Sequence, residues 1–220
     1  MTTSFLDTDQ YLAHYWPFSN ADMTDSIGNA HMQQGSATTF TSDRFECPSS
    51  ALNLNGGYTY IPPGIYFDTP QFTISVWIYP LSVGAWARII DFGNGAPLDN
   101  IILSQDSDST LLSAFHIYNG SSYKGNIVSS TSLTLSQWQF LTATFNGSNS
   151  TFYINGVSKG SVPAVYTLPT ITRTNNYIGK SNWASDGYSS SYLDDLRFYN
   201  KSLTQTEIIQ LMSLNSKMFI

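Results

Sequence analysis

Cysteine, charge and long apolar runs are all scarce in this chain of 220 residues. The single cysteine, Cys47, excludes an internal disulfide. Only 11% of the residues are charged and the net charge is −6, so the chain lacks the basic surface that nucleic acids and anionic membranes attract. No apolar run approaches the ~20 residues of a membrane span, and Met1–His14 lacks the pattern of a secretion signal. We therefore expect no nucleic-acid partner and no membrane insertion.

Glutamate is also scarce, which bears on catalysis. Of the 15 acidic residues only Glu46 and Glu207 are glutamates, and they are far apart in the sequence. Glycoside hydrolases need two carboxylates beside the scissile bond, whereas the adjacent Asp194 and Asp195 should point to opposite faces of a strand. The three histidines are scattered and form neither a nucleophile elbow nor metal-ligand spacing. We therefore expect a protein that is not an enzyme.

Aromatic residues are abundant, at 15%, and they alternate with polar ones. In residues 140–145, Leu, Ala and Phe alternate with Thr, and residues 151–154 alternate again. Asn155-Gly156 follows, the dipeptide best suited to a type I′ hairpin turn. Because period-two alternation indicates strands with one buried face, this region predicts the centre of an antiparallel sheet.

The remaining signals predict one all-β domain with a short helix at its end. Thr204 and Glu207 have the spacing of a capping box before an apolar stretch, which predicts a C-terminal helix. No linker or internal repeat divides the chain. We expect the domain to span residues 12–212, between tails at residues 1–11 and 213–220.

Five segments in order resemble laminin G-like domains of the concanavalin A-like jelly-roll superfamily. They are WQFLTATFNGSNSTFYINGVSKG at 138–160, FTISVWIYP at 72–80, SYLDDLRFYNKSL at 191–203, and residues 15–31 and 51–61. The resemblance covers nearly the whole chain. It implies an antiparallel two-sheet jelly-roll sandwich.

The same resemblance implies a calcium site. Residues 25–29, DSIGN, resemble a D-x-x-G-N turn at which many members of the family hold calcium together with the acid before the last strand. By this correspondence Asp25 and Asp194 supply carboxylates and Asn29 an oxygen. Asp194 shares the parity of Leu196 and Phe198, which places it on the core side of its strand. The alternative is that Asp25 caps its own turn and Asp194 bonds the N–H groups of a loop.

The loop at residues 181–192, SNWASDGYSSSY, is the strongest candidate for a ligand surface. Trp183, Asp186, Tyr188 and Tyr192 combine aromatic faces with a carboxylate, which suits the C–H faces and hydroxyls of a sugar. The alternative is that Trp183 packs under its own loop. Two further loops stand out, residues 83–88 with Trp86 and residues 91–100.

Together these features predict a non-catalytic extracellular recognition module, part of a larger multidomain protein, with carbohydrate as its ligand and calcium as a stabilising ion. The chief alternative is a module for adhesion to other extracellular proteins, and a glycoside hydrolase ranks third. Four N-x-S/T sequons, at residues 119, 146, 149 and 200, agree with secretion.

Overall fold

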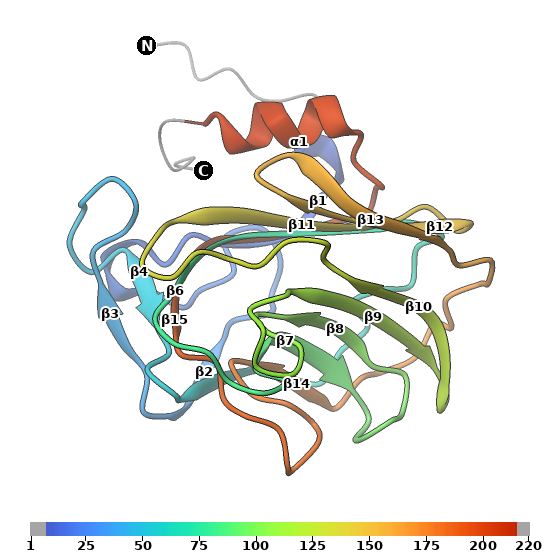
Figure 1. Cartoon of the computed structure of the whole chain (residues 1–220), viewed down its shortest axis with the longest axis horizontal. Coiled ribbons are helices and arrows are strands. Elements are labelled where there is room, and N and C mark those ends of the chain that lie inside the picture. The colour runs from blue at the N-terminus through green and yellow to red at the C-terminus, as the bar shows by residue number, and fades with distance from the viewer. Residues whose placement is uncertain (1–7, 215–220) are drawn as a thin grey trace.

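The computed structural model describes residues 8–214 and forms a sandwich of two antiparallel sheets (Figure 1). The eight-stranded sheet runs β13 (Val157–Pro163), β12 (Asn149–Ile154), β11 (Gln139–Phe145), β6 (Phe72–Pro80), β15 (Ser191–Tyr199), β4 (Ala51–Asn53) and β3 (Thr39–Thr41), with β1 (Leu12–Trp16) also paired to β15. The seven-stranded sheet runs β10 (Ser122–Val128), β9 (Ala114–Asn119), β8 (Ile101–Ser104), β7 (Arg88–Gly93), β14 (Asn175–Ile178), β5 (Tyr58–Ile61) and β2 (Gln33–Ser36). The predicted all-β jelly-roll sandwich is confirmed.

The helical parts are short. They are the 3-10 turns η1 (Asp9–Tyr11) and η2 (Ser19–Ala21) and the helix α1 (Gln205–Met212). All helices within residues 8–214 are too short or too polar to cross a membrane. The predicted tails fall largely on residues 1–7 and 215–220, which lie outside the described residues, so the domain limits stay a prediction.

The central hairpin forms as its sequence predicts. β11 and β12 pair antiparallel, and β12 turns into β13 through Asn155 (φ 50°) and Gly156 (φ 73°). Both residues have the positive φ that a type I′ turn requires. Leu141, Ala143 and Phe145 point into the core between the sheets, which confirms the predicted buried face.

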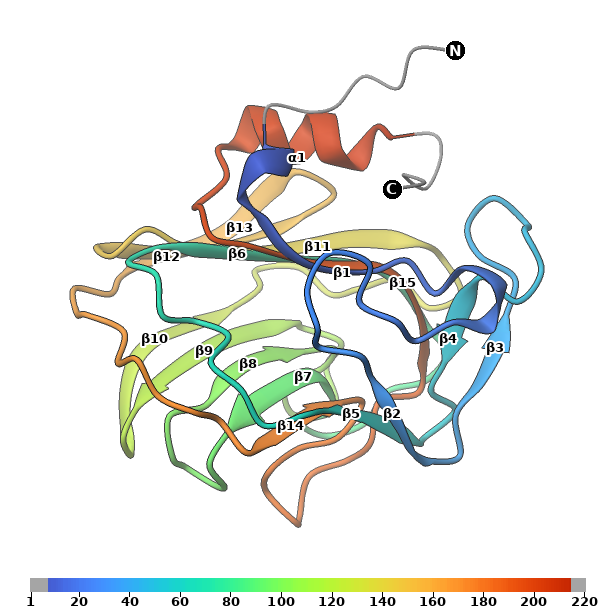
Figure 2. The same cartoon turned by 180° about the vertical axis from the view of Figure 1, so that it is seen from behind.

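Helix α1 covers the outer side of the eight-stranded sheet, away from the other sheet, where Figure 2 shows β1 lying beside β15. Ile208 and Leu211 of the helix belong to a second apolar cluster with Tyr15 and Phe140. The predicted capping box is present: the Thr204 hydroxyl accepts from the N–H of Glu207, whose carboxylate accepts from the N–H of Thr204. Such a cap stabilises a helix by about 1 kcal/mol.

A β-bulge in β15 corrects the predicted orientation of its acidic pair. The register with β6 shifts between Asp194 and Arg197, and Asp195 has a φ of 53°. The bulge puts Leu193 and Leu196 in the core, so the parity argument that placed Asp194 on the core side is wrong. The expectation that the two acids point apart is wrong for the same reason, because both contact the guanidinium of Arg44.

Candidate functional site

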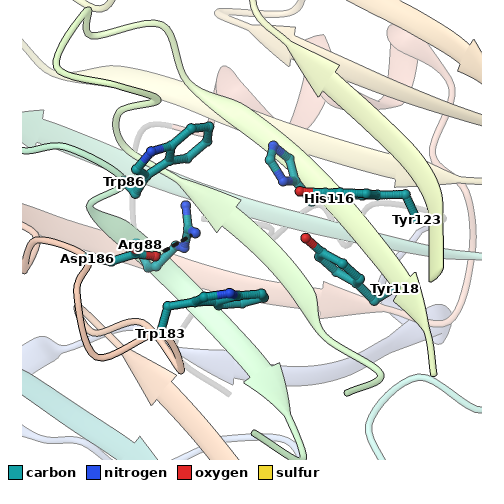
Figure 3. Close-up of a pocket in the computed structure, with 7 residues that line it drawn as sticks. All are labelled: Trp86, Arg88, His116, Tyr118, Tyr123, Trp183 and Asp186. Carbon is teal, nitrogen blue, oxygen red and sulfur yellow. Dashed lines mark hydrogen bonds and ion pairs between the residues drawn. The ribbon is translucent and has the colours of Figure 1, made fainter. Parts of the chain in front are cut away.

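A hollow of about 190 Å³ opens on the outer face of the seven-stranded sheet (Figure 3). β9 contributes His116 and Tyr118, which point outward because their neighbours Phe115 and Ile117 fill the core. The other contributions come from β7, β10 and the loops before β7 and before β15. The seven lining residues are Trp86, Arg88, His116, Tyr118, Tyr123, Trp183 and Asp186.

Arg88 lies in the middle of the hollow, between two indole rings (Figure 3). Its guanidinium carbon is 5.4 Å from the centroid of Trp86 and 5.7 Å from that of Trp183, within cation–π range. Its Nη1 donates to Ser104 Oγ (2.8 Å) and its Nη2 to Asp186 Oδ2 (2.8 Å). These contacts hold the side chain of Arg88 in a fixed position between the two indole rings.

The two tryptophan-bearing loops are tied together by backbone bonds. The N–H of Gly187 donates to the carbonyl of Ala85 (2.9 Å), and a Cβ at Gly187 would lie only 3.0 Å from that oxygen, so glycine permits the close approach. Trp86 itself has a φ of 57°, a left-handed conformation that costs a non-glycine residue roughly 1–2 kcal/mol. A strained, half-buried tryptophan beside a hollow is typical of a functional position.

Asp91 of β7 anchors the loop that carries Trp183. It is fully buried, and its carboxylate accepts hydrogen bonds from the backbone N–H of Asn182 (2.8 Å) and from the side-chain amides of Asn182 (2.9 Å) and Asn100 (2.7 Å). Burial raises the pKa of Asp91, and these bonds act in the opposite direction. Because Trp183 directly follows Asn182, the hydrogen bonds between Asn182 and Asp91 also fix the position of the Trp183 backbone.

The charges in the hollow balance. Asp186 pairs with Arg88, and Ser181 Oγ also donates to Asp186 Oδ2 (2.7 Å). Burial lowers the pKa of His116 to about 4, and the positive charge of Arg88 acts in the same direction, so the imidazole is neutral near pH 7. His116 Nε2 and Arg88 Nε are buried and have no hydrogen-bond partner within the described part of the chain. The side chains that line the hollow therefore carry no net charge, and two of their nitrogen atoms are buried without a partner among the described residues.

Two tyrosines complete the wall. The rings of Tyr118 and Tyr123 lie 4.2 Å apart, and that of Tyr118 lies 5.7 Å from Trp183. Burial raises the pKa of the Tyr118 hydroxyl, and its hydrogen bond with Tyr123 adds to the effect. Flat apolar faces thus surround the polar centre.

The structure brings three of the four predicted ligand residues together. Trp183 and Asp186 line this hollow, and together with Tyr188 they line a second one beside it. Tyr192 lies on β15 in the other sheet, where its ring stacks on Tyr79 with centroids 5.3 Å apart. Trp86 belongs to a loop that the sequence also indicated.

Sequence reasoning missed four lining residues: Arg88, His116, Tyr118 and Tyr123. A signal exists in residues 115–118, Phe-His-Ile-Tyr, where apolar side chains alternate with polar aromatic ones. The alternation predicts an outward His116–Tyr118 face. It does not say which loops border that face.

The predicted calcium residues are engaged in other contacts. Asp25 Oδ1 accepts from the N–H groups of Tyr15, Ile27 and Gly28, and Asp25 Oδ2 accepts from the N–H of Ala30 and lies 2.6 Å from His14 Nδ1. Burial alone would raise the pKa of Asp25, but these hydrogen bonds lower it well below its usual range. Asp25 therefore caps its own turn, as in the alternative that the sequence left open.

Asp194 is paired with Arg44, and Asn29 is exposed. A guanidinium that contacts both Asp194 and Asp195 already supplies the positive charge that calcium would bring. Residues 8–214 hold no group of three His, Cys, Asp or Glu side chains with the arrangement of a metal site. These residues do not fit a shared calcium ion, and calcium binding stays a prediction from the resemblance.

Comparisons with known proteins show which family and which solved structures this chain resembles. A laminin G family model, described as the concanavalin A-like lectin/glucanases superfamily, matches residues 53–209. No curated protein matches the sequence significantly. Among solved structures, domain 4 of AbnA, a GH43 extracellular arabinanase from Geobacillus stearothermophilus, in complex with arabinotriose, has a TM-score of 0.74 at 22% identity, covering 92% of this chain and 98% of that one.

Toxin binding domains are also similar in fold. The botulinum neurotoxin serotype G binding domain has a TM-score of 0.70 at 17% identity, covering 90% of this chain and 50% of that one. A structure of botulinum neurotoxin type C has a TM-score of 0.68 at 17% identity, covering 93% of this chain and 51% of that one. The cell entry of that toxin is described as dependent upon interaction with two ganglioside molecules. The chain thus spans about half of these toxin domains, and identities this low show a shared fold alone. With its family-model match and two-sheet sandwich, the chain belongs to the concanavalin A-like lectin/glucanase superfamily.

Proposed function

We propose that this domain is a non-catalytic carbohydrate-binding module and that the hollow around Arg88 is its sugar site. The observation that carries the proposal is the pair of indoles, Trp86 and Trp183, on either side of Arg88 in an open hollow. Indole faces pack against the C–H faces of a sugar ring, while buried polar atoms fix the direction of its hydroxyls. Arg88, His116 and Asp186 are polar side chains among the residues that line the hollow.

The charges in the hollow favour binding over hydrolysis. Of its lining residues only Asp186 is a carboxylate, and it is already bonded to Arg88 and Ser181. Asp91, the next acid, is buried beneath the hollow and accepts hydrogen bonds from two asparagines. A glycosidase needs a second accessible carboxylate across the scissile bond. The proposal therefore assigns binding without turnover.

We also propose that the domain works outside the cell as part of a larger protein. Its fold neighbour with arabinotriose is one domain of an extracellular arabinanase, and the toxin neighbours are binding domains. A recognition module attached to another domain keeps that domain near its substrate by raising the effective concentration.

Calorimetric titration with neutral oligosaccharides tests the proposal. Arabinotriose, xylotriose and cellotriose are suitable probes, and we expect at least one to bind the wild type. Trp183→Ala should weaken that binding at least tenfold, because it removes one wall of the hollow. The matched control is Trp138→Ala, a half-buried tryptophan that packs on Tyr79 at the other sheet and should leave the affinity unchanged.

Two outcomes contradict the proposal. One is the absence of binding to every sugar of a broad glycan array, which would favour a protein partner. The other is a loss of affinity in Trp138→Ala and not in Trp183→Ala. Trp138 lines a separate hollow with Arg44, Phe45 and Trp77, so this result would move the site to the eight-stranded sheet.

A further inference from the structure

A second hollow of about 200 Å³ lies directly beside the first. It is lined by Lys180, Ser181, Trp183, Ala184, Asp186, Gly187 and Tyr188. Trp183 and Asp186 line both hollows, so the indole is a shared wall between them. Each hollow is smaller than the ~300 Å³ at which pockets for drug-sized ligands begin, whereas the two together exceed it. Such a pair suits a chain of two or more sugar units that crosses the Trp183 wall.

The second hollow differs from the first in its charge. Lys180 Nζ lies 4.7 Å from the ring centroid of Tyr58 and 4.6 Å from that of Tyr177, so two aromatic faces hold the ammonium in place. Tyr188, which is exposed, extends this cluster with its ring 6.1 Å from Tyr58. Lys180 makes no salt bridge with any carboxylate of residues 8–214.

The carboxylate that lines the second hollow does not pair with Lys180. Asp186 is the one carboxylate among the residues that line the second hollow, and its Oδ2 accepts from Arg88 and Ser181. The first hollow is therefore balanced within itself, and the second carries one positive charge at a fixed place. A ligand group that carries one negative charge complements it.

We propose that the second hollow binds an acidic sugar unit whose carboxylate pairs with Lys180, while the neighbouring neutral unit stacks in the first hollow. This inference rests on the proposed sugar-binding function and names its ligand class, an oligosaccharide that bears a uronic or other carboxylate sugar. The net charge of −6 disfavours densely charged polyanions, so an isolated carboxylate on an otherwise neutral chain fits best.

Pairs of oligosaccharides that differ only in charge test the proposal. Glucuronosyl xylotriose and sialyllactose are titrated calorimetrically at low salt beside their methyl esters, which keep the shape and remove the charge. At least one acid should bind the wild type about tenfold more tightly than its ester. Lys180→Met should abolish this preference, because it should weaken the binding of the acid about tenfold more than that of the ester. Lys159→Met, on β13 in the other sheet, is the matched control and should keep the preference.

The outcomes separate this inference from the function on which it rests. If acids and esters bind equally to the wild type, or if Lys180→Met weakens both equally, the acidic subsite is overturned. The sugar-binding function survives that result if Trp183→Ala still removes the binding of the esters. If no acid, ester or neutral sugar binds, both proposals are overturned.

Discussion

The outer faces of the two sheets both carry aromatic residues but differ in what covers them. On the eight-stranded sheet, Tyr15 and Phe140 lie beneath α1, and Ile208 and Leu211 of the helix complete an apolar cluster. Figure 1 shows that, within residues 8–214, no helix covers the outer side of the seven-stranded sheet, the side on which the hollow with Trp86 and Trp183 opens. Aromatic content alone therefore does not mark a binding face. The proposed binding face differs in that no helix of residues 8–214 packs over it.

The charged groups of the two faces also differ. Beside the covered cluster, Arg44 contacts Asp194 and Asp195, Asp195 Oδ1 accepts from the Tyr15 hydroxyl (2.5 Å), and Arg197 Nη2 lies 3.2 Å from the same oxygen. On the open face, His116 Nε2 is buried without a partner among the described residues. Paired and unpartnered groups occur on both faces, since Arg88 pairs with Asp186 on the open face and Arg197 Nε has no partner among the described residues on the covered one. The difference is that the covered face concentrates its charges in one larger paired network.

Breaking the paired network should have the largest effect on stability. Arg44→Ala leaves two fully buried carboxylates without this partner, and removing one partner of a buried ion pair costs about 3–5 kcal/mol. We expect urea denaturation at pH 7 to show a loss of about 3 kcal/mol, with sugar affinity unchanged. The control is Lys201→Ala, whose partly exposed pair with Glu207 is worth less than about 1 kcal/mol. Equal losses in the two variants would contradict the assignment of Arg44 to a buried network that stabilises the fold.

On the open face, His116 should make stability depend on pH. Its pKa is about 4 when folded, against 6.5 for the ordinary side chain, because of burial and the nearby Arg88. Between pH 4 and pH 6.5 the unfolded chain binds more protons than the folded one. The contribution of neutral His116 to the free energy of unfolding is therefore complete above pH 6.5 and is lost as the pH falls toward 4. The difference corresponds to at most ~3 kcal/mol.

The variant His116→Gln isolates this effect. Urea denaturation between pH 7 and pH 4.5 should show the wild type losing more stability than the variant. The capping carboxylate of Asp25 does not interfere, because its lowered pKa places its own loss of stability below pH 3.8. Parallel pH profiles for the two proteins would show that His116 is not held neutral in the hollow.

The sequence predicted those parts of the fold that depend on local signals. The Asn155-Gly156 turn, the strand at 140–145 and the capping box of α1 each follow from residues close together in the chain. The orientation of Asp194 could not be predicted in this way, because a bulge with a positive φ at Asp195 reverses the alternation of the strand. An aspartate in the sequence does not by itself indicate a bulge.

The candidate site was predictable only in its loops. Trp183 and Asp186 stood out because their loop combines aromatic faces with a carboxylate, and both line the hollow. His116 and Tyr118 alternate with core residues, but many strands present such a face to solvent. That these strand residues meet Trp86 and Trp183 depends on the bond between Gly187 and Ala85, a contact between distant segments that spacing does not encode.

Calcium should have the smallest effect on stability. The family resemblance predicts a calcium site at Asp25, whereas the hydrogen bonds of Asp25 leave it engaged in its own turn. An ion shared by Asp25, Asn29 and Asp194 would stabilise the fold by about 2.7 kcal/mol at a hundredfold excess over its Kd, which corresponds to several degrees in Tm. The oxygens of Asp25, however, already accept from four backbone N–H groups and contact His14, so an ion would have to displace these bonds. We therefore expect the same Tm in millimolar calcium and in EDTA. A rise of several degrees that EDTA reverses and Asp194→Asn removes would instead support the calcium site, and would mean that Arg44 leaves Asp194 when the ion binds.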